Sequence, residues 1–516
     1  MESKQIKFGA ILSYIQIFVA IAVSLVYTPI LVRELGQNEY GLYNTVTSVV
    51  TLIELLKLGF NHSYIRYYSK YQSDKDNDNI NKLNGLFILV FSALGVVALF
   101  CGLLLSQEIE LVFNYKMVSD EINIAKNLLI ISTFNLAFSF PSTVFSTIVL
   151  AQERFVFIKI LTIVQTIAVP LATLPFLLLG YGSISVVAVI FAVSVIISVI
   201  TAFYVFFVLH SKFVFKDFEK GLFKSMMQYT AFIAVNSIVD YLNWSVDKFL
   251  LGRYCSFTSV AVYSVGYTVY SLYMNLSTAA SNVFVPHIHK IVNELKANAL
   301  EMNKALTNIF IKIGRIQFFV LGLFLTGLIF FGKPFIVLWV GSEYKNAYYV
   351  MLLFIISAFV PLIQNIGIEI QRALNKHQFR SLLYLFMALT NLVISYFLCR
   401  RYGEIGAAFG TAFSLVVANG IAMNIYYHKH CGLSVLSFFG SILRMCKGVI
   451  LPVIYGVVIS VVFEINTFLS LILHAVLFTS IYIASMWLLA LNDEEKNGVR
   501  KFIVNVVGRG YDKNNR

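Results

Sequence analysis

Long apolar stretches, separated by short polar breaks, follow one another from residue 9 to residue 490. Each stretch is close to the roughly 20 helical residues that cross the hydrocarbon core of a bilayer. The stretches are continuously apolar and do not alternate, which favours helices over the strands of a membrane barrel. The pattern therefore predicts an all-α integral membrane protein with about fourteen transmembrane helices.

The composition agrees with a membrane assignment. Hydrophobic residues make up 59% of the chain and charged residues only 13%, whereas soluble domains have about 25% charged residues. The predicted spans begin near Gly9, Tyr40, Leu83, Ala125, Lys159, Ile184, Ser225, Ser259, Ile309, Ala347, Ser381, Ile405, Cys446 and Phe468.

The basic residues are distributed unevenly between the two sides of this predicted topology. With the N-terminus in the cytoplasm, 27 of the 39 Lys and Arg residues fall in cytoplasmic segments and eight in outer segments. Such an excess is the positive-inside signal, so we expect both termini in the cytoplasm. The net charge of +13 then reflects topology and does not indicate a nucleic-acid partner.

The two halves of the chain match at an offset of about 220 residues. The matched pairs are Arg33 with Arg253, Tyr43 with Tyr263, Gly102 with Gly322, Pro141 with Pro361 and, one residue further, Tyr181-Gly182 with Tyr402-Gly403. Six spans separate equivalent positions, and an even number preserves orientation, so the repeats are parallel. We expect lobes at 1–220 and 221–445, two extra helices at 446–490 and a cytoplasmic tail at 491–516.

Pro141 and Pro361 each remove a backbone hydrogen bond within a predicted span and should bend it. Their equivalent positions suggest a gating role. The alternative is that they are ordinary prolines of membrane helices.

Three segments carry a resemblance to a known family: the run from Thr28 to Tyr43 (TPILVRELGQNEYGLY), Leu58-Gly59 with Arg66, and Asp247-Lys248-Phe-Leu-Leu-Gly252. They resemble the oligosaccharide flippases of the polysaccharide-transporter family. That family belongs to the multidrug/oligosaccharidyl-lipid/polysaccharide (MOP) superfamily, which also contains multidrug extruders and the lipid II flippase. The resemblance implies V-shaped lobes and outward movement of an undecaprenyl-diphosphate-linked oligosaccharide across a bacterial inner membrane, for lipopolysaccharide or capsule biosynthesis.

The seventh predicted span carries an unusual polar stripe. Asn236, Asp240, Asn243 and Asp247 recur at i, i+4, i+7 and i+11, which places them on one helical face. Lys248 lies about 100° around the helix from Asp247. Charged groups in a membrane are costly and mark ion or substrate paths. We expect Asp240 and Asp247 to couple transport to H⁺ or Na⁺; interhelical packing is the alternative.

Other candidate residues are more ambiguous. Glu54 and Lys57 are three residues apart and can form a local ion pair, so Glu54 is a further coupling candidate or part of a structural pair. The cations Lys57, Arg66, Lys248, Arg315 and Arg372 are candidates for holding a diphosphate, because ammonium and guanidinium groups bind phosphate oxygens. Arg66 could equally be a positive-inside anchor. The sugar-stacking candidates are Tyr263, Tyr267 and Tyr270, with ordinary packing as the alternative.

Together these features predict a secondary-active flippase and not an enzyme. Its partners would be a polyprenyl-diphosphate-linked oligosaccharide and the lipid bilayer, and a polysaccharide polymerase with its chain-length machinery. The sequence lacks a Gly-rich phosphate loop with its Lys, so we expect no ATP and no cofactor beyond a coupling ion. The rivals are a lipid II flippase or a multidrug/cation antiporter on the same fold, and a membrane glycosyltransferase or polymerase. The longest predicted outer gap, from about Ser106 to Glu121, is too short for a catalytic domain.

Overall fold

The described part of the chain is helical throughout. The structure is a computed structural model, and it describes residues 2–57, 59–113, 117–218, 221–282, 284–376, 378–498 and 500. The helices of the first half are α1 (Glu2–Glu54), α2 (Phe60–Ser73), α3 (Asn77–Gln107), α4 (Ile109–Val112), α5 (Ser119–Ala151), α6 (Phe155–Leu178), α7 (Gly182–Phe203), α8 (Leu222–Trp244) and α9 (Val246–Tyr254).

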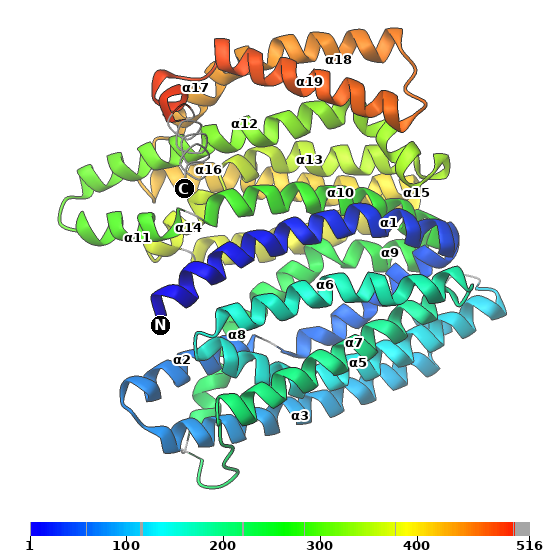
Figure 1. Cartoon of the computed structure of the whole chain (residues 1–516), viewed down its shortest axis with the longest axis vertical. Coiled ribbons are helices and arrows are strands. Elements are labelled where there is room, and N and C mark those ends of the chain that lie inside the picture. Colours follow the sequence, from blue (N-terminus) through cyan, green and yellow to red (C-terminus); the bar gives the residue numbers. More distant parts are fainter. Residues whose placement is uncertain are drawn as a thin grey trace, which may run out of the picture. The chain divides into compact units, whose positions relative to one another are not determined.

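The second half continues this pattern of long and short helices (Figure 1). Its helices are α10 (Phe257–Asn282), α11 (Val285–Glu294), α12 (Ala299–Val340), α13 (Ala347–Ile363), α14 (Ile366–Ala373), α15 (Gln378–Leu415), α16 (Met423–Lys429), α17 (Val435–Met445), α18 (Ile450–Val462) and α19 (Phe468–Leu489). Short 3₁₀ or π segments are η1 (Leu55–Lys57), η2 (Tyr204–Val208), η3 (Ser342–Tyr344), η4 (Val416–Ala422) and η5 (Cys446–Val449).

Two of the longest helices contain a sharp change of direction. At about 1.5 Å per residue, the 53 residues of α1 would extend roughly 80 Å, more than twice a bilayer core. Gly36 (φ 70°, ψ 169°) breaks α1, and Gly403 (φ 57°, ψ −136°) breaks α15. Glycine adopts these positive φ values without a Cβ clash. Each helix therefore consists of two segments, as the sequence predicted for the spans near Gly9 and Tyr40.

Nine of the described helices, or ten with the bent pair α13–α14, are long and apolar enough to cross a membrane. All fourteen predicted span starts lie within a described helix or, for Cys446, in η5 directly before α18. Many large apolar side chains on these helices are exposed, among them Phe18 and Leu171, as expected for surfaces that face lipid. The prediction of an all-helical membrane protein is confirmed, while the count of fourteen spans stays a prediction.

The chain divides into two compact units, whose boundaries fall within α10 and α15. Unit 1 contains residues 1–268 and 380–414, and unit 2 contains residues 269–379 and 415–516. This division differs from the lobes expected from the sequence repeat, which stay a prediction. The aligned residues Gly182 and Gly403 share a positive φ, of 64° and 57°.

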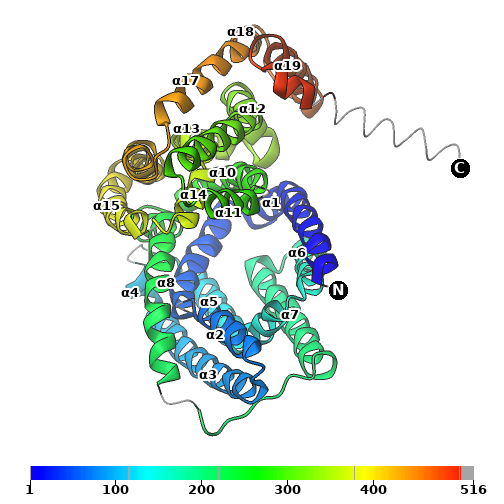
Figure 2. The ribbon, with the colours of Figure 1, turned by 90° about the vertical axis from the view of Figure 1, so that its left-hand side faces the viewer.

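In unit 1, α3, α5 and α7 pack side by side, and α6 packs on α1 and α7 (Figure 2). Aromatic rings fill the space between α2, α3 and α5: the ring of Phe87 lies 4.7 Å from that of Tyr64 and 4.5 Å from that of Phe91. Between membrane helices such rings stabilise the contact through close van der Waals packing. This packing joins α2 and α3, and Phe91 extends it to Phe140 of α5, with ring centres 6.2 Å apart.

In unit 2, an arginine on α12 joins three segments. Arg315 donates to both carboxylate oxygens of Glu495, at 2.6 and 2.7 Å, and to the carbonyl oxygens of Ala490 (3.0 Å) and Ser441 (3.3 Å). The side chains of Arg315 and Glu495 are only 8% and 17% exposed. A bidentate pair of this kind is strong and geometrically specific. It fixes the segment after α19 to α12 and α17.

We expect Glu495→Gln to lower the free energy of unfolding by about 1–3 kcal/mol, because a charge-assisted pair loses its anion. Partial burial alone would raise the pKa of Glu495, but the hydrogen bonds from Arg315 and the Asn492 backbone, with the nearby positive charges, outweigh it and lower the pKa. Because the pKa of Glu495 in the folded protein lies below the unfolded value of about 4.3, its ionised carboxylate stabilises the fold above about pH 4.3. This stabilisation is lost as the pH falls through the folded-state pKa. Thermal unfolding in detergent should therefore show a difference that is full at pH 7 and shrinks below about pH 4.3.

The matched control is Glu494→Gln. Glu494 pairs with Lys312 at 2.8 Å, but both side chains are more than half exposed, and exposed pairs contribute roughly 0–1 kcal/mol. Equal effects of the two substitutions would contradict the special role of the Arg315 pair.

Candidate functional site: a buried carboxylate in a polar cage

Asp247 lies at the start of a short helix. The backbone leaves regular helical geometry at Ser245 (φ −119°, ψ −29°), where α8 ends, and α9 begins at Val246. Asp247 is therefore in the first turn of α9, where the positive end of the helix dipole favours a carboxylate. Its side chain is fully buried. The break at Ser245 also separates Asp247 from the polar stripe expected along one continuous helix.

One carboxylate oxygen of Asp247 has two partners. Tyr263 of α10 donates its hydroxyl to Oδ2 at 2.8 Å, and Thr411 of α15 donates to the same atom at 2.5 Å. The other oxygen, Oδ1, is buried and accepts no hydrogen bond from any residue that the structure describes. Leaving a buried acceptor unpaired costs about 1–3 kcal/mol, and more for a charged group.

A second layer of polar side chains on α15 surrounds this carboxylate. The Asn391 amide and the Thr411 hydroxyl lie 3.3 Å apart, and the Ser395 hydroxyl lies within hydrogen-bond distance of two acceptors, Asn391 Oδ1 at 3.1 Å and the Ala407 carbonyl oxygen at 3.2 Å. Asn391, Ser395 and Thr411 are all buried. We call Asp247, Tyr263, Asn391, Ser395 and Thr411 the Asp247 cage; all five belong to unit 1.

The cage offers oxygen atoms and no cationic side chain. Among the described side chains, those that bond to ionised Asp247 are neutral hydroxyl donors, which do not balance its charge. A proton on Oδ1 would remove the charge, and a small cation beside Oδ1 would compensate it, since hard cations prefer oxygen ligands. The arrangement can therefore exchange a proton or a monovalent cation.

Lys248 has different partners from its neighbour Asp247. Its ammonium lies 3.4 Å from Asn44 Oδ1 on α1 and 5.1 Å from the centre of the Tyr267 ring. The Tyr267 ring also contacts Trp244, with ring centres 6.1 Å apart. Lys248 forms no ion pair with a carboxylate among the described residues. The first turn of α9 thus carries the carboxylate of Asp247 and the ammonium of Lys248, and the described partners of both are neutral.

Glu54 and Lys57 form the local ion pair considered from the sequence, at 2.7 Å. The Lys57 ammonium also lies 5.4 Å from the centre of the Phe140 ring. Lys57 lines a cavity of about 380 Å³ within unit 1. The other lining residues are mostly polar: Ser139, Ser142, Thr143, Ser146, Ile158, Leu161, Thr162, Gln165, Ser194, Ile197, Ser198 and Thr201.

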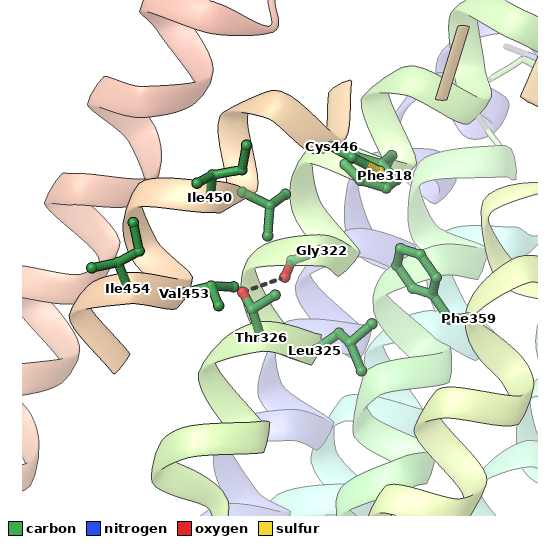
Figure 3. A pocket seen from close by; sticks show the side chains of 10 residues that line it. Phe318, Gly322, Leu325, Thr326, Phe359, Cys446, Ile450, Val453 and Ile454 are labelled. Atoms are coloured by element: carbon green, nitrogen blue, oxygen red, sulfur yellow. Dashed lines mark hydrogen bonds between the residues drawn. The ribbon is translucent and has the colours of Figure 1, made fainter. Parts of the chain in front are cut away.

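Unit 2 contains a cavity of the opposite character, with a volume of about 400 Å³ (Figure 3). The one hydroxyl in its wall, that of Thr326, donates to the Gly322 carbonyl oxygen at 2.7 Å, so the surface is apolar. The wall comes from α12, α13, η5 and α18: Phe318, Gly322, Leu325, Thr326, Phe359, Cys446, Val449, Ile450, Val453 and Ile454. Such a surface suits a hydrocarbon chain.

The remaining anionic and cationic candidates lie outside these groups. Asp240 is exposed on α8 and Arg66 is exposed on α2. Arg372 is exposed and pairs with Glu369 at 2.6 Å. Arg315 is occupied by Glu495.

The remaining aromatic and proline candidates also lie elsewhere. Tyr270 is buried against Phe354, with ring centres 5.4 Å apart. Pro141 lies within the continuous helix α5, and Pro361 lies just before the 45° bend between α13 and α14. The side chain of Asn236 lies outside the described part of the structure.

Sequence reasoning missed three of the five cage residues. Asn391 and Ser395 are four residues apart in an apolar span, which is the same signal that drew attention to α8 and α9. Thr411 carried no comparable signal, because a single threonine in a membrane helix is ordinary. Only folding shows that it donates to Asp247.

Comparison with known proteins shows a family and several relatives. The model of the family described as "Polysaccharide biosynthesis protein" matches residues 7–292. A Shigella flexneri protein named "Putative O-antigen transporter" is 22% identical over 413 residues, covering 78% of this chain and 92% of that protein. A "Probable low-salt glycan biosynthesis flippase" of Haloferax volcanii is 24% identical over 210 residues, 40% of this chain and 41% of that protein.

Solved structures share the fold at low sequence identity. The lipid II flippase MurJ, in an inward closed conformation, has a TM-score of 0.69 at 16% identity, over 92% of this chain and 99% of that chain. A multidrug resistance MATE family transporter of the MOP superfamily has a TM-score of 0.57 at 13% identity, over 82% and 99%. These two matches establish the fold alone.

The fold is thus that of the MOP superfamily of membrane transporters. The chain belongs to the polysaccharide biosynthesis protein family, since the family model covers more than half of it. The predicted resemblance is confirmed, and so is the prediction of a flippase-type transporter and not an enzyme.

The close packing around the cage gives a stability prediction. A Cβ atom on Gly410 would lie 2.3 Å from Ser395 Oγ and 3.0 Å from Asn391 Oδ1. Gly410→Ala should therefore push the Ser395 hydroxyl away from its acceptors and lower the free energy of unfolding by about 1–3 kcal/mol. Thermal unfolding in detergent measures this effect.

Gly440→Ala on α17 is the control, because no atom lies within 4 Å of the added carbon. It should leave stability unchanged or raise it by up to about 1 kcal/mol through helix propensity. If both variants unfold at the same temperature, the close approach at Gly410 is wrong.

Proposed function

We propose that this protein is a flippase that moves a lipid-linked oligosaccharide from the inner to the outer leaflet of the bacterial cytoplasmic membrane. The observation that carries the proposal is the buried Asp247, with one unpartnered oxygen, in a chain of the polysaccharide biosynthesis family. The names of the Shigella and Haloferax relatives support a glycan as cargo. The lipid would be undecaprenyl diphosphate, with both protein termini in the cytoplasm and a polysaccharide polymerase with its chain-length machinery acting on the product.

The proposed substrate has three chemically different parts. Its hydrocarbon chain suits an apolar surface such as the cavity of unit 2. Its diphosphate needs cations, and Lys248 is the strongest candidate because its described partners are neutral. Lys57, Arg66, Arg315 and Arg372 stay candidates of lower rank, since Lys57, Arg315 and Arg372 have carboxylate partners. Tyr263, Tyr267 and Tyr270 stay candidates for contacting the glycan.

Asp247 would couple transport to an ion gradient. Ionised Asp247 needs a proton or Na⁺ at Oδ1, and release of that ion leaves an uncompensated buried charge. The helices that form the cage, α9, α10 and α15, would then favour a different arrangement, which is the basis of alternating access between two lobes. Pro141 and Pro361 would provide the bends, and Glu54 and Asp240 are secondary coupling candidates.

Asp247→Asn tests the coupling. The variant keeps the side-chain volume but cannot bind a cation by charge, so transport driven by a gradient should fall at least about tenfold, to the rate without a gradient. The measurement is translocation of a fluorescent polyprenyl-diphosphate oligosaccharide in liposomes, with a pH gradient and a Na⁺ gradient imposed separately.

Glu494→Gln is the control, because Glu494 is an exposed carboxylate after α19 and outside the cage, and it should keep its gradient dependence. Unchanged gradient dependence in Asp247→Asn would remove Asp247 from the mechanism. Transport of small organic cations in place of the lipid-linked sugar would favour a multidrug antiporter, and a strict requirement for lipid II would favour that flippase.

Lys248→Met tests diphosphate binding. Loss of the ammonium removes a charge-assisted contact, so the KM for the same lipid-linked probe should rise about tenfold or more. Lys333→Met, at an exposed position of α12, should leave the KM unchanged. An unaltered KM in Lys248→Met would exclude Lys248 from the headgroup site.

A further inference from the structure

The polar cavity of unit 1 has an unusual wall for a membrane protein. Its hydroxyls come from three neighbouring helices, α5, α6 and α7, which pack against one another. Lys57 of η1 contributes the one ammonium group among the lining residues. The volume of about 380 Å³ falls in the range of roughly 300–1,000 Å³ typical of small-molecule sites.

Most hydroxyls of this wall point their hydrogen atoms back into their own helices. Six of them donate to a carbonyl oxygen three or four residues earlier: Ser139 to Leu136, Ser142 to Phe138, Thr143 to Ser139, Ser146 to Thr143, Thr162 to Ile158 and Thr201 to Ile197. Because a hydroxyl oxygen has two lone pairs, each of these groups is left as an acceptor. The cavity therefore offers a set of acceptor oxygens.

Three other polar side chains of the wall have no hydrogen-bond partner in the part of the chain that the structure describes. They are Gln165 on α6, and Ser194 and Ser198, which lie one helical turn apart on α7. A polar group in a membrane protein that lacks a protein partner needs water or a ligand. These three groups can both donate and accept.

The ammonium in the wall is held in place. Glu54 binds Lys57 from one side, and the Phe140 ring lies beneath it. The carboxylate of Glu54 offsets most of the charge, so the cavity is close to neutral. An anionic diphosphate would meet mainly acceptor oxygens there, and a hydrocarbon chain would leave Gln165, Ser194 and Ser198 unpaired.

We propose that this cavity binds one sugar residue of the transported glycan. Its hydroxyls donate to acceptor oxygens among these six and exchange hydrogen bonds with Gln165, Ser194 and Ser198. The inference rests on the proposed function and adds to it a carbohydrate subsite inside unit 1. The site recognises a neutral, hydroxyl-rich ring and not the lipid or its phosphates.

Binding to two probes tests the subsite. One is a short polyprenyl diphosphate, and the other is the same lipid carrying a single hexose. In the double variant Ser194→Ala/Ser198→Ala, the Kd for the sugar-bearing probe should rise about tenfold, as expected for the loss of two ordinary hydrogen bonds. The Kd for the bare diphosphate should not change. The full-length protein in detergent or nanodiscs serves for both measurements.

Two further variants serve as controls. Ser460→Ala/Ser480→Ala removes two exposed hydroxyls on α18 and α19 that donate to their own helices, and it should bind both probes normally. Ser194→Thr/Ser198→Thr keeps both hydroxyls and should retain selective binding of the sugar-bearing probe. Together they separate loss of the subsite from a general effect on the fold.

Each remaining result overturns the proposal. Equal weakening of both probes in the alanine variant would mean that the cavity binds phosphate or supports the fold, and no weakening would mean that it holds only water. If the wild-type protein binds the bare diphosphate but gains nothing from the hexose, the subsite is wrong while the flippase proposal survives. If it binds and transports neither probe, the flippase proposal itself fails.

Discussion

The hydrocarbon core of a bilayer offers no hydrogen-bond partner, so every polar atom within it must be satisfied by the protein, by enclosed water or by a ligand. This constraint organises the described structure. Serine and threonine hydroxyls along α5 and α6 donate hydrogen bonds to backbone carbonyl oxygens of their own helices. Glycines such as Gly410 have no side chain, so the backbone can lie close to a hydrogen-bonded polar group such as that of Ser395. A polar atom that escapes this rule is informative, because something outside the protein must complete it.

Two places in unit 1 where described polar groups lack a protein partner differ in chemistry. In the Asp247 cage, one carboxylate oxygen has no described partner, and a proton or a cation bound there would compensate the negative charge. The polar cavity beside Lys57 has neutral amide and hydroxyl groups without described partners, so it calls for a neutral ligand. Unit 2 contains an apolar cavity and a buried arginine that is fully bonded. A substrate with a lipid chain, a charged bridge and a sugar needs surfaces of all these kinds.

Much of the architecture could be read from the chain, and the candidate site only in part. Fourteen apolar stretches predicted the helices because the need to span a bilayer constrains composition directly. Asp247 and Tyr263 were both singled out, but for separate reasons: one as a charge in an apolar span and one as a sugar-stacking ring. In the structure they share a hydrogen bond. Arg315, expected near a diphosphate, instead holds Glu495 of a segment 180 residues away in the chain.

The sequence by itself determined that this protein lies in a membrane, that it is helical and which family it belongs to, because hydropathy and local motifs are properties of single segments. It also identified the charged residues whose burial in a membrane costs free energy, since a charge in an apolar span can be recognised without knowing the fold. Only the tertiary structure decided which of these charges are satisfied. Thr411 donates to Asp247 across 164 residues of the chain, and α8 ends at Trp244, before that carboxylate. Such pairings depend on how helices meet, which no local pattern records.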